Sequence, residues 1–223
     1  MVDELLSDRE QEEALRNWWR ENWSWVLSGI VLGLALLFGW RWWEARQIAR
    51  DEGAAVTYRE LLGALDRADR EAAESLETQL ESEFAQTPYV DQAHLALARA
   101  LVAQRDFDGA ATRLRTVMQT SEDEELRRVA RLRLARVLIE QDKVDETLAL
   151  LDPANAGAFA ALEHALRGDA FVVHGDTEAA RREYAAALAA PPDDPTVNRA
   201  LLQLKLDALG PAPAAPADAE AGS

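Results

Sequence analysis

The sequence predicts an all-α protein with one transmembrane helix near its N-terminus, followed by a TPR-like solenoid of helical hairpins. Three observations predict this fold class. An apolar segment near the N-terminus has tryptophans at both ends, and a pattern of small and large apolar residues recurs after 37 and then 33 residues. Ala, Leu, Glu and Arg dominate the composition, whereas runs of β-branched residues are rare.

The transmembrane helix is predicted at residues 22–43, after a short N-terminal segment at 1–21. Positions 22–40 carry no charge, and a helix of this length can cross the hydrocarbon core of a bilayer. Tryptophans favour the two headgroup layers, and all seven lie at the ends of this segment. They are Trp18, Trp19, Trp23, Trp25, Trp40, Trp42 and Trp43.

Two other interpretations of the apolar segment fit the sequence less well. A buried core helix fits poorly with its length and its two aromatic ends. A cleavable signal peptide needs small residues after the apolar core, whereas Gly39 is followed by bulky and basic residues up to Glu44, which favours an uncleaved anchor. The arginines on the two flanks do not decide its orientation.

Gly29 and Gly33 form a Gly-x-x-x-Gly pair within the predicted span. Such a pair lets a second helix approach closely, so these glycines are candidates for packing in the membrane. The alternative is that glycine is simply common in membrane helices.

The predicted helical domain covers residues 44–209. Apolar residues at three- and four-residue spacing predict that the anchor continues into a helix ending near Asp69, and a second helix follows at about 71–84. The residues with that spacing are Ala55, Tyr58, Leu62 and Leu65.

Three repeat copies follow. Residues 93–108 align with 130–145, and a third copy starts 33 residues later. We expect the paired helices to touch at the small residues Ala98, Ala135 and Gly168. A last helix is predicted at about 194–209, and the Pro/Ala-rich tail at 210–223 is predicted to be disordered.

Composition and motifs exclude several classes of function. The chain has 24 Lys+Arg, 40 Asp+Glu and a net charge of −16, so it repels nucleic acid. It has no cysteine, and His94, His164 and His174 lack the spacing of metal ligands. We therefore expect no cofactor or metal, and the absence of catalytic motifs argues against an enzyme.

In a TPR stack the first helix of each hairpin lines a concave groove, which predicts the residues that contact a partner. Arg99 and Arg136 align in this pattern over an apolar floor, and would hold a helix or extended peptide. The alternative is that both arginines pair with acids on adjacent helices. The predicted groove residues are Gln92, Leu95, Arg99, Val102, Val129, Leu132, Arg136, Ile139, Leu162, Ala165, Asp169 and Val172.

The chain resembles the ancillary SecYEG translocon subunit family (YfgM-like) over nearly its whole length. The resemblance is carried by Glu10–Trp18, Gly39–Trp43, Leu132–Val137, and Leu166–Ala170 continuing into His174–Arg181. It implies a single-pass protein of the bacterial inner membrane, with the N-terminus in the cytoplasm and the TPR-like domain in the periplasm. The chain departs from the family in its Pro/Ala tail and its strongly acidic surface.

The resemblance also implies partners: the SecYEG translocon, a membrane-anchored periplasmic chaperone of the PpiD type, and unfolded exported chains. The expected function is a protein-interaction module, anchored in the lipid bilayer, that links the translocon to chaperones for newly exported proteins. The alternative is an envelope-assembly scaffold that contacts other membrane proteins mainly through its transmembrane helix.

Overall fold

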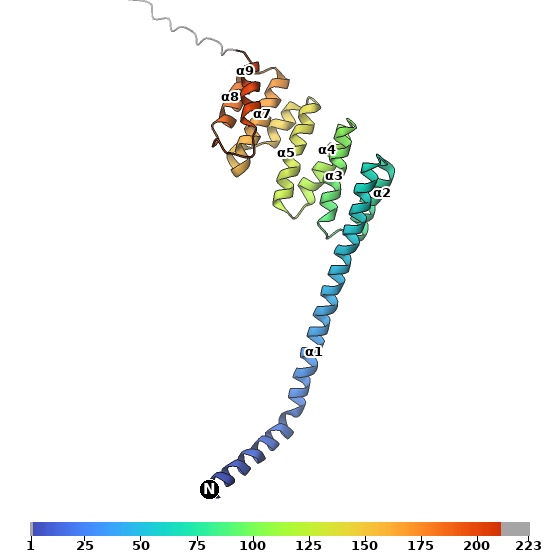
Figure 1. Ribbon diagram of the computed structural model, residues 1–223, viewed down its shortest axis with the longest axis vertical. Coiled ribbons are helices and arrows are strands. Elements are labelled where there is room, and N and C mark those ends of the chain that lie inside the picture. The colour runs from blue at the N-terminus through green and yellow to red at the C-terminus, as the bar shows by residue number, and fades with distance from the viewer. Residues whose placement is uncertain (1, 211–223) are drawn as a thin grey trace, which may run out of the picture. The chain divides into compact units, whose positions relative to one another are not determined.

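The computed structural model describes the backbone of residues 2–210, and the side chains of residue 13 and residues 15–210. The predicted tail therefore lies, apart from Gly210, outside the described residues. The chain divides into two compact units, Met1–Ala55 and Val56–Ser223. Every regular element of the described residues is a helix, so the all-α prediction is confirmed (Figure 1).

The first unit consists of helix α1 (Val2–Asp66) up to Ala55. This helix holds a window with a mean hydropathy of 1.7, long and apolar enough to cross a membrane, of which no part is buried inside the protein. Leu36 and Phe38 are each 67% exposed. A core helix would bury such side chains, so that interpretation of the segment is wrong.

The tryptophans after the apolar stretch of α1 contact one another and a neighbouring cation. The ring centroids of Trp40 and Trp43 lie 5.6 Å apart, and the Arg46 guanidinium lies 4.9 Å from the ring centroid of Trp42. Indole rings beside a basic side chain are typical of the membrane interface, where both kinds of side chain contact apolar and polar surroundings.

Up to Gly210, the second unit contains four helical hairpins and a closing helix. The end of α1 pairs in sequence with α2, and the next hairpins are α3–α4, α5–α6 and α7–α8, followed by α9. Two 3₁₀ turns, η1 (Pro153–Asn155) and η2 (Gly157–Phe159), connect α6 to α7. The helix bounds are α2 (Arg70–Glu83), α3 (Tyr89–Ala103), α4 (Phe107–Thr120), α5 (Glu124–Glu140), α6 (Val144–Leu150), α7 (Ala160–His174), α8 (Thr177–Leu188) and α9 (Arg199–Ala208).

One turn geometry recurs in all four hairpins. A residue with positive φ ends the first helix, and the backbone N–H of the residue after it donates to a carbonyl five positions earlier, as Asp106 N does to Leu101 O. In three of the turns, the aspartate at this next position caps the second helix, for example Asp176 on Ala179 N. The positive-φ residues are Ala68, Arg105, Asp142 and Gly175. The hairpin of α1 and α2 thus adds a fourth repeat to the three predicted.

Two of the three predicted small contact residues are buried, and the third lies in close contact with its paired helix. Ala98 and Ala135 are buried. A Cβ atom on Gly168 would overlap the ring of Tyr184, so only glycine fits there. Tyr184 is itself buried and packs in a cluster with Ala165. These contacts make α7 and α8 one rigid hairpin.

The last helix begins later than predicted. Asp194 accepts hydrogen bonds from the backbone N–H and the hydroxyl of Thr196, which forms a turn. Asn198 then caps α9 by accepting from Leu201 N. The helix therefore begins at Arg199 instead of near residue 194.

Candidate protein-binding groove

The end of α1, α3 and α5 together line two adjacent cavities of the second unit. The larger has a volume of about 860 Å³ and lies between α3 and α5, closed at one side by the start of α4. The smaller has a volume of about 570 Å³ and lies against Tyr58, Leu62 and Leu65 of α1. Arg99, Ala103 and Arg133 line both, so the two form one continuous surface, which we call the arginine groove. Its members are Tyr58, Leu62, Leu65, Asp66, Gln92, Leu95, Ala96, Ala98, Arg99, Ala100, Val102, Ala103, Arg105, Phe107, Leu114, Arg133, Arg136, Val137, Ile139 and Glu140.

The floor of the arginine groove is apolar. Leu95, Leu114 and Val137 are buried members of the main hydrophobic core, and Phe107 packs against that core from the side. Helix packing therefore fixes the position of the floor, which gives a bound segment a preformed apolar surface.

Four arginines surround this floor: Arg99, Arg105, Arg133 and Arg136. Within the described part of the chain, none of their guanidinium groups has a hydrogen bond or an ion pair to another protein group. Partial burial lowers the pKa of Arg136, and repulsion from neighbouring Arg133 adds to this effect.

The structure brings together six of the residues that sequence analysis placed in a groove. They are Gln92, Leu95, Arg99, Val102, Arg136 and Ile139. Among the described residues, Arg99 and Arg136 line the cavities without an ion pair to an acid on an adjacent helix, although the charge of Asp169 acts on Arg136.

The other predicted residues lie away from both cavities. Leu132 is buried in a cluster with Leu151 and Leu166, and Leu162 packs against that cluster. Val129 is half-buried at the start of α5, and Val172 is exposed on α7. Val129 and Leu132 of the second predicted copy and Leu162 and Val172 of the third therefore lie outside the groove, whose lining ends at α5.

Two further predicted residues of that copy have structural partners. Asp169 accepts from the Tyr184 hydroxyl at 2.6 Å and from Lys205 Nζ at 2.6 Å. Burial raises the pKa of Tyr184, and the Asp169 carboxylate adds to this effect. Ala165 belongs to the buried cluster that contains Tyr184.

Sequence analysis missed the α1 side of the groove. The spacing of Tyr58, Leu62 and Leu65 predicts an amphipathic helix but does not indicate that the helix lines a groove. The ring of Tyr58 lies 5.7 Å from that of Tyr89, between ring centroids, which joins α1 to α3. Arg133 had no signal in the repeat, because the residue 37 positions earlier is Ala96.

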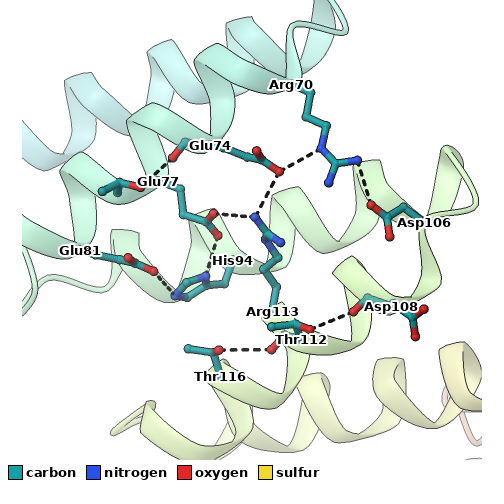
Figure 2. A network of polar contacts seen from close by, with 11 residues as sticks. Arg70, Glu74, Glu77, Glu81, His94, Asp106, Asp108, Thr112, Arg113 and Thr116 are labelled. Atoms are coloured by element: carbon teal, nitrogen blue, oxygen red, sulfur yellow. Dashed lines mark hydrogen bonds and ion pairs between the residues drawn. The ribbon is translucent and has the colours of Figure 1, made fainter.

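A second polar cluster, which we call the His94 network, connects α2, α3 and α4 (Figure 2). Buried His94 contacts Glu77 Oε1 through Nδ1 at 2.8 Å and Glu81 Oε1 through Nε2 at 3.3 Å. Arg113 of α4 pairs with Glu77 at 3.2 Å and with Glu74 at 3.4 Å. Arg70 continues the chain, at 2.9 Å from Glu74 and 2.8 Å from Asp106.

The charges of the His94 network are mutually compensated. Burial opposes ionisation of Glu77, but the hydrogen bond from His94 and the charge of Arg113 outweigh it and lower the pKa of Glu77. His94 is thus a hydrogen-bonded core histidine. A metal ion fits poorly, because the two carboxylates face different nitrogens of one imidazole ring.

The fold and the groove define a membrane-anchored helical-repeat protein with a preformed concave surface. A family profile described as tetratricopeptide repeat-like domain matches residues 16–211, and the chain belongs to this family. The family consists of repeat proteins of a non-enzymatic kind.

Curated relatives are similar over both the anchor and the repeats. A protein of Escherichia coli strain K12 named ancillary SecYEG translocon subunit is 29% identical, covering 91% of this chain and 97% of that protein. Proteins with the same name are 28% identical in Haemophilus influenzae, over 82% of this chain and 89% of theirs, and 27% identical in Neisseria gonorrhoeae, over 92% and 98%. The resemblance stated from the sequence is thereby confirmed. No solved structure matches the chain.

Proposed function

We propose that this chain is an ancillary subunit of the SecYEG translocon that links the translocon to periplasmic chaperones for newly exported proteins. The observation that carries the proposal is the extent of the similarity to proteins of that name, which covers the membrane helix as well as the repeats. A shared repeat domain alone would support only a shared fold. In this proposal the chain has no catalytic activity.

The proposed orientation places the N-terminus in the cytoplasm and the repeat domain in the periplasm of a bacterial inner membrane. The resemblance supports this orientation, whereas the charges that flank the apolar stretch do not decide it. In that arrangement the arginine groove lies in the compartment into which the translocon releases its substrates.

The proposed mechanism separates the two units by role. The membrane helix holds the repeat domain beside the translocon, which raises the effective concentration of the groove for nearby segments. Weak binding in the groove then suffices to retain a PpiD-type chaperone or an emerging chain. Gly29 and Gly33 support a helix contact in the membrane, because a Cβ atom on either would meet nothing within 4 Å.

The test compares three forms of the full-length protein by affinity purification from detergent-solubilised membranes. One form is unchanged, one has residues 22–43 replaced by an unrelated transmembrane helix, and one carries Arg99→Glu and Arg136→Glu. We expect SecYEG and a chaperone with the unchanged form, loss of SecYEG with the replaced helix, and loss of the chaperone with the charge reversals. Recovery of neither partner from the unchanged form would contradict the proposal.

The same experiment addresses the scaffold alternative, which the exposed apolar face of α1 favours. A scaffold that works through its transmembrane helix would lose every partner when that helix is replaced. It would also keep every partner when Arg99 and Arg136 are reversed.

A further inference from the structure

We propose that the arginine groove selects segments of partner proteins that combine carboxylates with large apolar side chains. This inference rests on the proposed function, because it specifies which segments the groove binds. Its basis is the charge and the shape of the groove.

The charge of the groove is opposite to that of the molecule. Four arginines line it, against two carboxylates, Asp66 and Glu140. The whole chain has a net charge of −16, so this basic surface is a local exception. Electrostatic complementarity therefore favours an acidic occupant and disfavours a basic one.

The unpaired state of the guanidinium groups also constrains the occupant. A neutral segment seated over Arg99, Arg133 and Arg136 would remove water from these cations without replacing their hydrogen bonds, which is unfavourable. Carboxylates supply those hydrogen bonds, and guanidinium groups bind them in a bidentate geometry. A segment that brings its own carboxylates is therefore bound with the least desolvation cost.

Apolar residues are the second requirement, because the floor is apolar and fixed. Phe107, Leu114 and Val137 face a cavity of about 860 Å³, which needs bulky side chains to fill it. The chain's own residues 211–223 contain Asp218 and Glu220, but alanine and proline are their only apolar residues apart from one glycine. A partner protein is therefore a better occupant than this segment.

The test uses three fluorescent synthetic peptides of about 15 residues with the same leucine pattern, in which the polar positions are all Glu, all Gln or all Lys. Binding to the full-length protein in nanodiscs is measured by fluorescence anisotropy at about 50 and 300 mM NaCl. We expect the Glu peptide to bind about tenfold or more tightly than the Gln peptide, with a strong salt dependence, and the Lys peptide to bind least.

Matched double charge reversals assign the effect to the groove. Arg133→Glu with Arg136→Glu is expected to weaken the Glu peptide about tenfold or more, whereas Arg115→Glu with Arg182→Glu changes the net charge equally and should leave affinity almost unchanged. Arg133→Lys with Arg136→Lys should recover part of the affinity, and circular dichroism checks that each variant is folded.

Three results would overturn the inference: equal binding of the Glu and Gln peptides, equal loss in both double reversals, or binding of the Glu peptide only after residues 211–223 are deleted. Recovery of SecYEG with the unchanged protein is measured separately and does not use these peptides. If SecYEG is recovered but the peptides are not distinguished, this inference fails while the proposed function stands.

Discussion

The His94 network and the arginine groove contain the same kinds of charged side chain and use them in opposite ways. In the network, Arg113 and Arg70 are each shared between two carboxylates. In the groove, Arg133 and Arg136 lie beside each other and form no ion pair or hydrogen bond with a carboxylate among the described residues, although the charge of Asp169 acts on Arg136. Paired charges hold helices together, whereas unpaired charges over an apolar floor remain available to a partner.

This comparison predicts that the network supports stability and the groove supports binding. The largest expected effect is that of Glu77→Ala, which leaves buried His94 and Arg113 without their shared carboxylate. Breaking a buried pair on one side is expected to cost about 3 kcal/mol in the free energy of unfolding. Urea unfolding of the full-length protein in detergent, followed by circular dichroism, measures it.

Glu74→Ala is the matched control for this change. It removes a carboxylate from the same helix that pairs with Arg113 and Arg70 but is more exposed. We expect it to cost about 1 kcal/mol or less. Equal effects of the two substitutions would mean that the network owes its stability to helix surface charge and not to the buried pair.

A second prediction concerns the pH dependence of two buried glutamates. The pKa of Glu77 is lowered in the folded state, so its stabilising contribution is present above its usual pKa and is lost as the pH falls through the lowered value. Burial raises the pKa of Glu163, whose Oε2 has no hydrogen-bond partner among the described residues. Its contribution therefore has the opposite sign, since stability falls as the pH rises from the usual pKa to the raised one.

Glutamine substitutions separate the two signs. We expect Glu163→Gln to stabilise the protein by about 1 kcal/mol at neutral pH, with the gain disappearing below about pH 4, because the neutral amide avoids burying a charge. We expect Glu77→Gln to destabilise it at neutral pH, with the loss shrinking in the same acid range. Unfolding measured between about pH 3 and 7 tests both, and a parallel pH dependence of the two variants would contradict the prediction.

The repeat architecture was predictable from the sequence, whereas the His94 network was not. The alignment of residues 93–108 with 130–145 located the hairpins because helix contacts need small residues at fixed spacing. His94 and Glu77 lie 17 residues apart on different hairpins, so their contact depends on how α2 and α3 are rotated against each other. No local sequence pattern predicts this relative rotation of the two helices.

The groove was predictable where it follows the repeat. Arg99 and Arg136 are equivalent positions, 37 residues apart, and both line it. Arg133 breaks the repeat, and Leu62 belongs to a hairpin that joins the membrane helix, so neither had a repeat partner that would have marked it. The third copy contributes no residue to the groove, because the lining of both cavities ends at α5.

A smaller effect is expected at Arg105, where one substitution should raise the stability of the protein and weaken binding in the groove. Arg105 lines the groove at a φ of 61°, a conformation that costs an L-residue energy and suits glycine. Arg105→Gly should therefore stabilise the protein by about 0.5–1 kcal/mol while weakening binding of the Glu peptide. Asp142→Gly, at the equivalent turn with a φ of 59° and outside the groove, should stabilise without changing binding.

The smallest expected change in stability is that of Arg133→Ala, and it is the sharpest test of the comparison. Arg133 forms no ion pair among the described residues, and its positive charge repels that of Arg136. Its removal should therefore change the free energy of unfolding by less than about 0.5 kcal/mol. The same substitution should still weaken the Glu peptide, because it deletes a cation shared by both cavities. Arg113→Ala, in the His94 network, should show the reverse, with a clear loss of stability and unchanged peptide binding. If Arg133→Ala destabilises the protein as much as Arg113→Ala, the groove arginines stabilise the fold. That result would contradict the hypothesis that they are available to bind a partner.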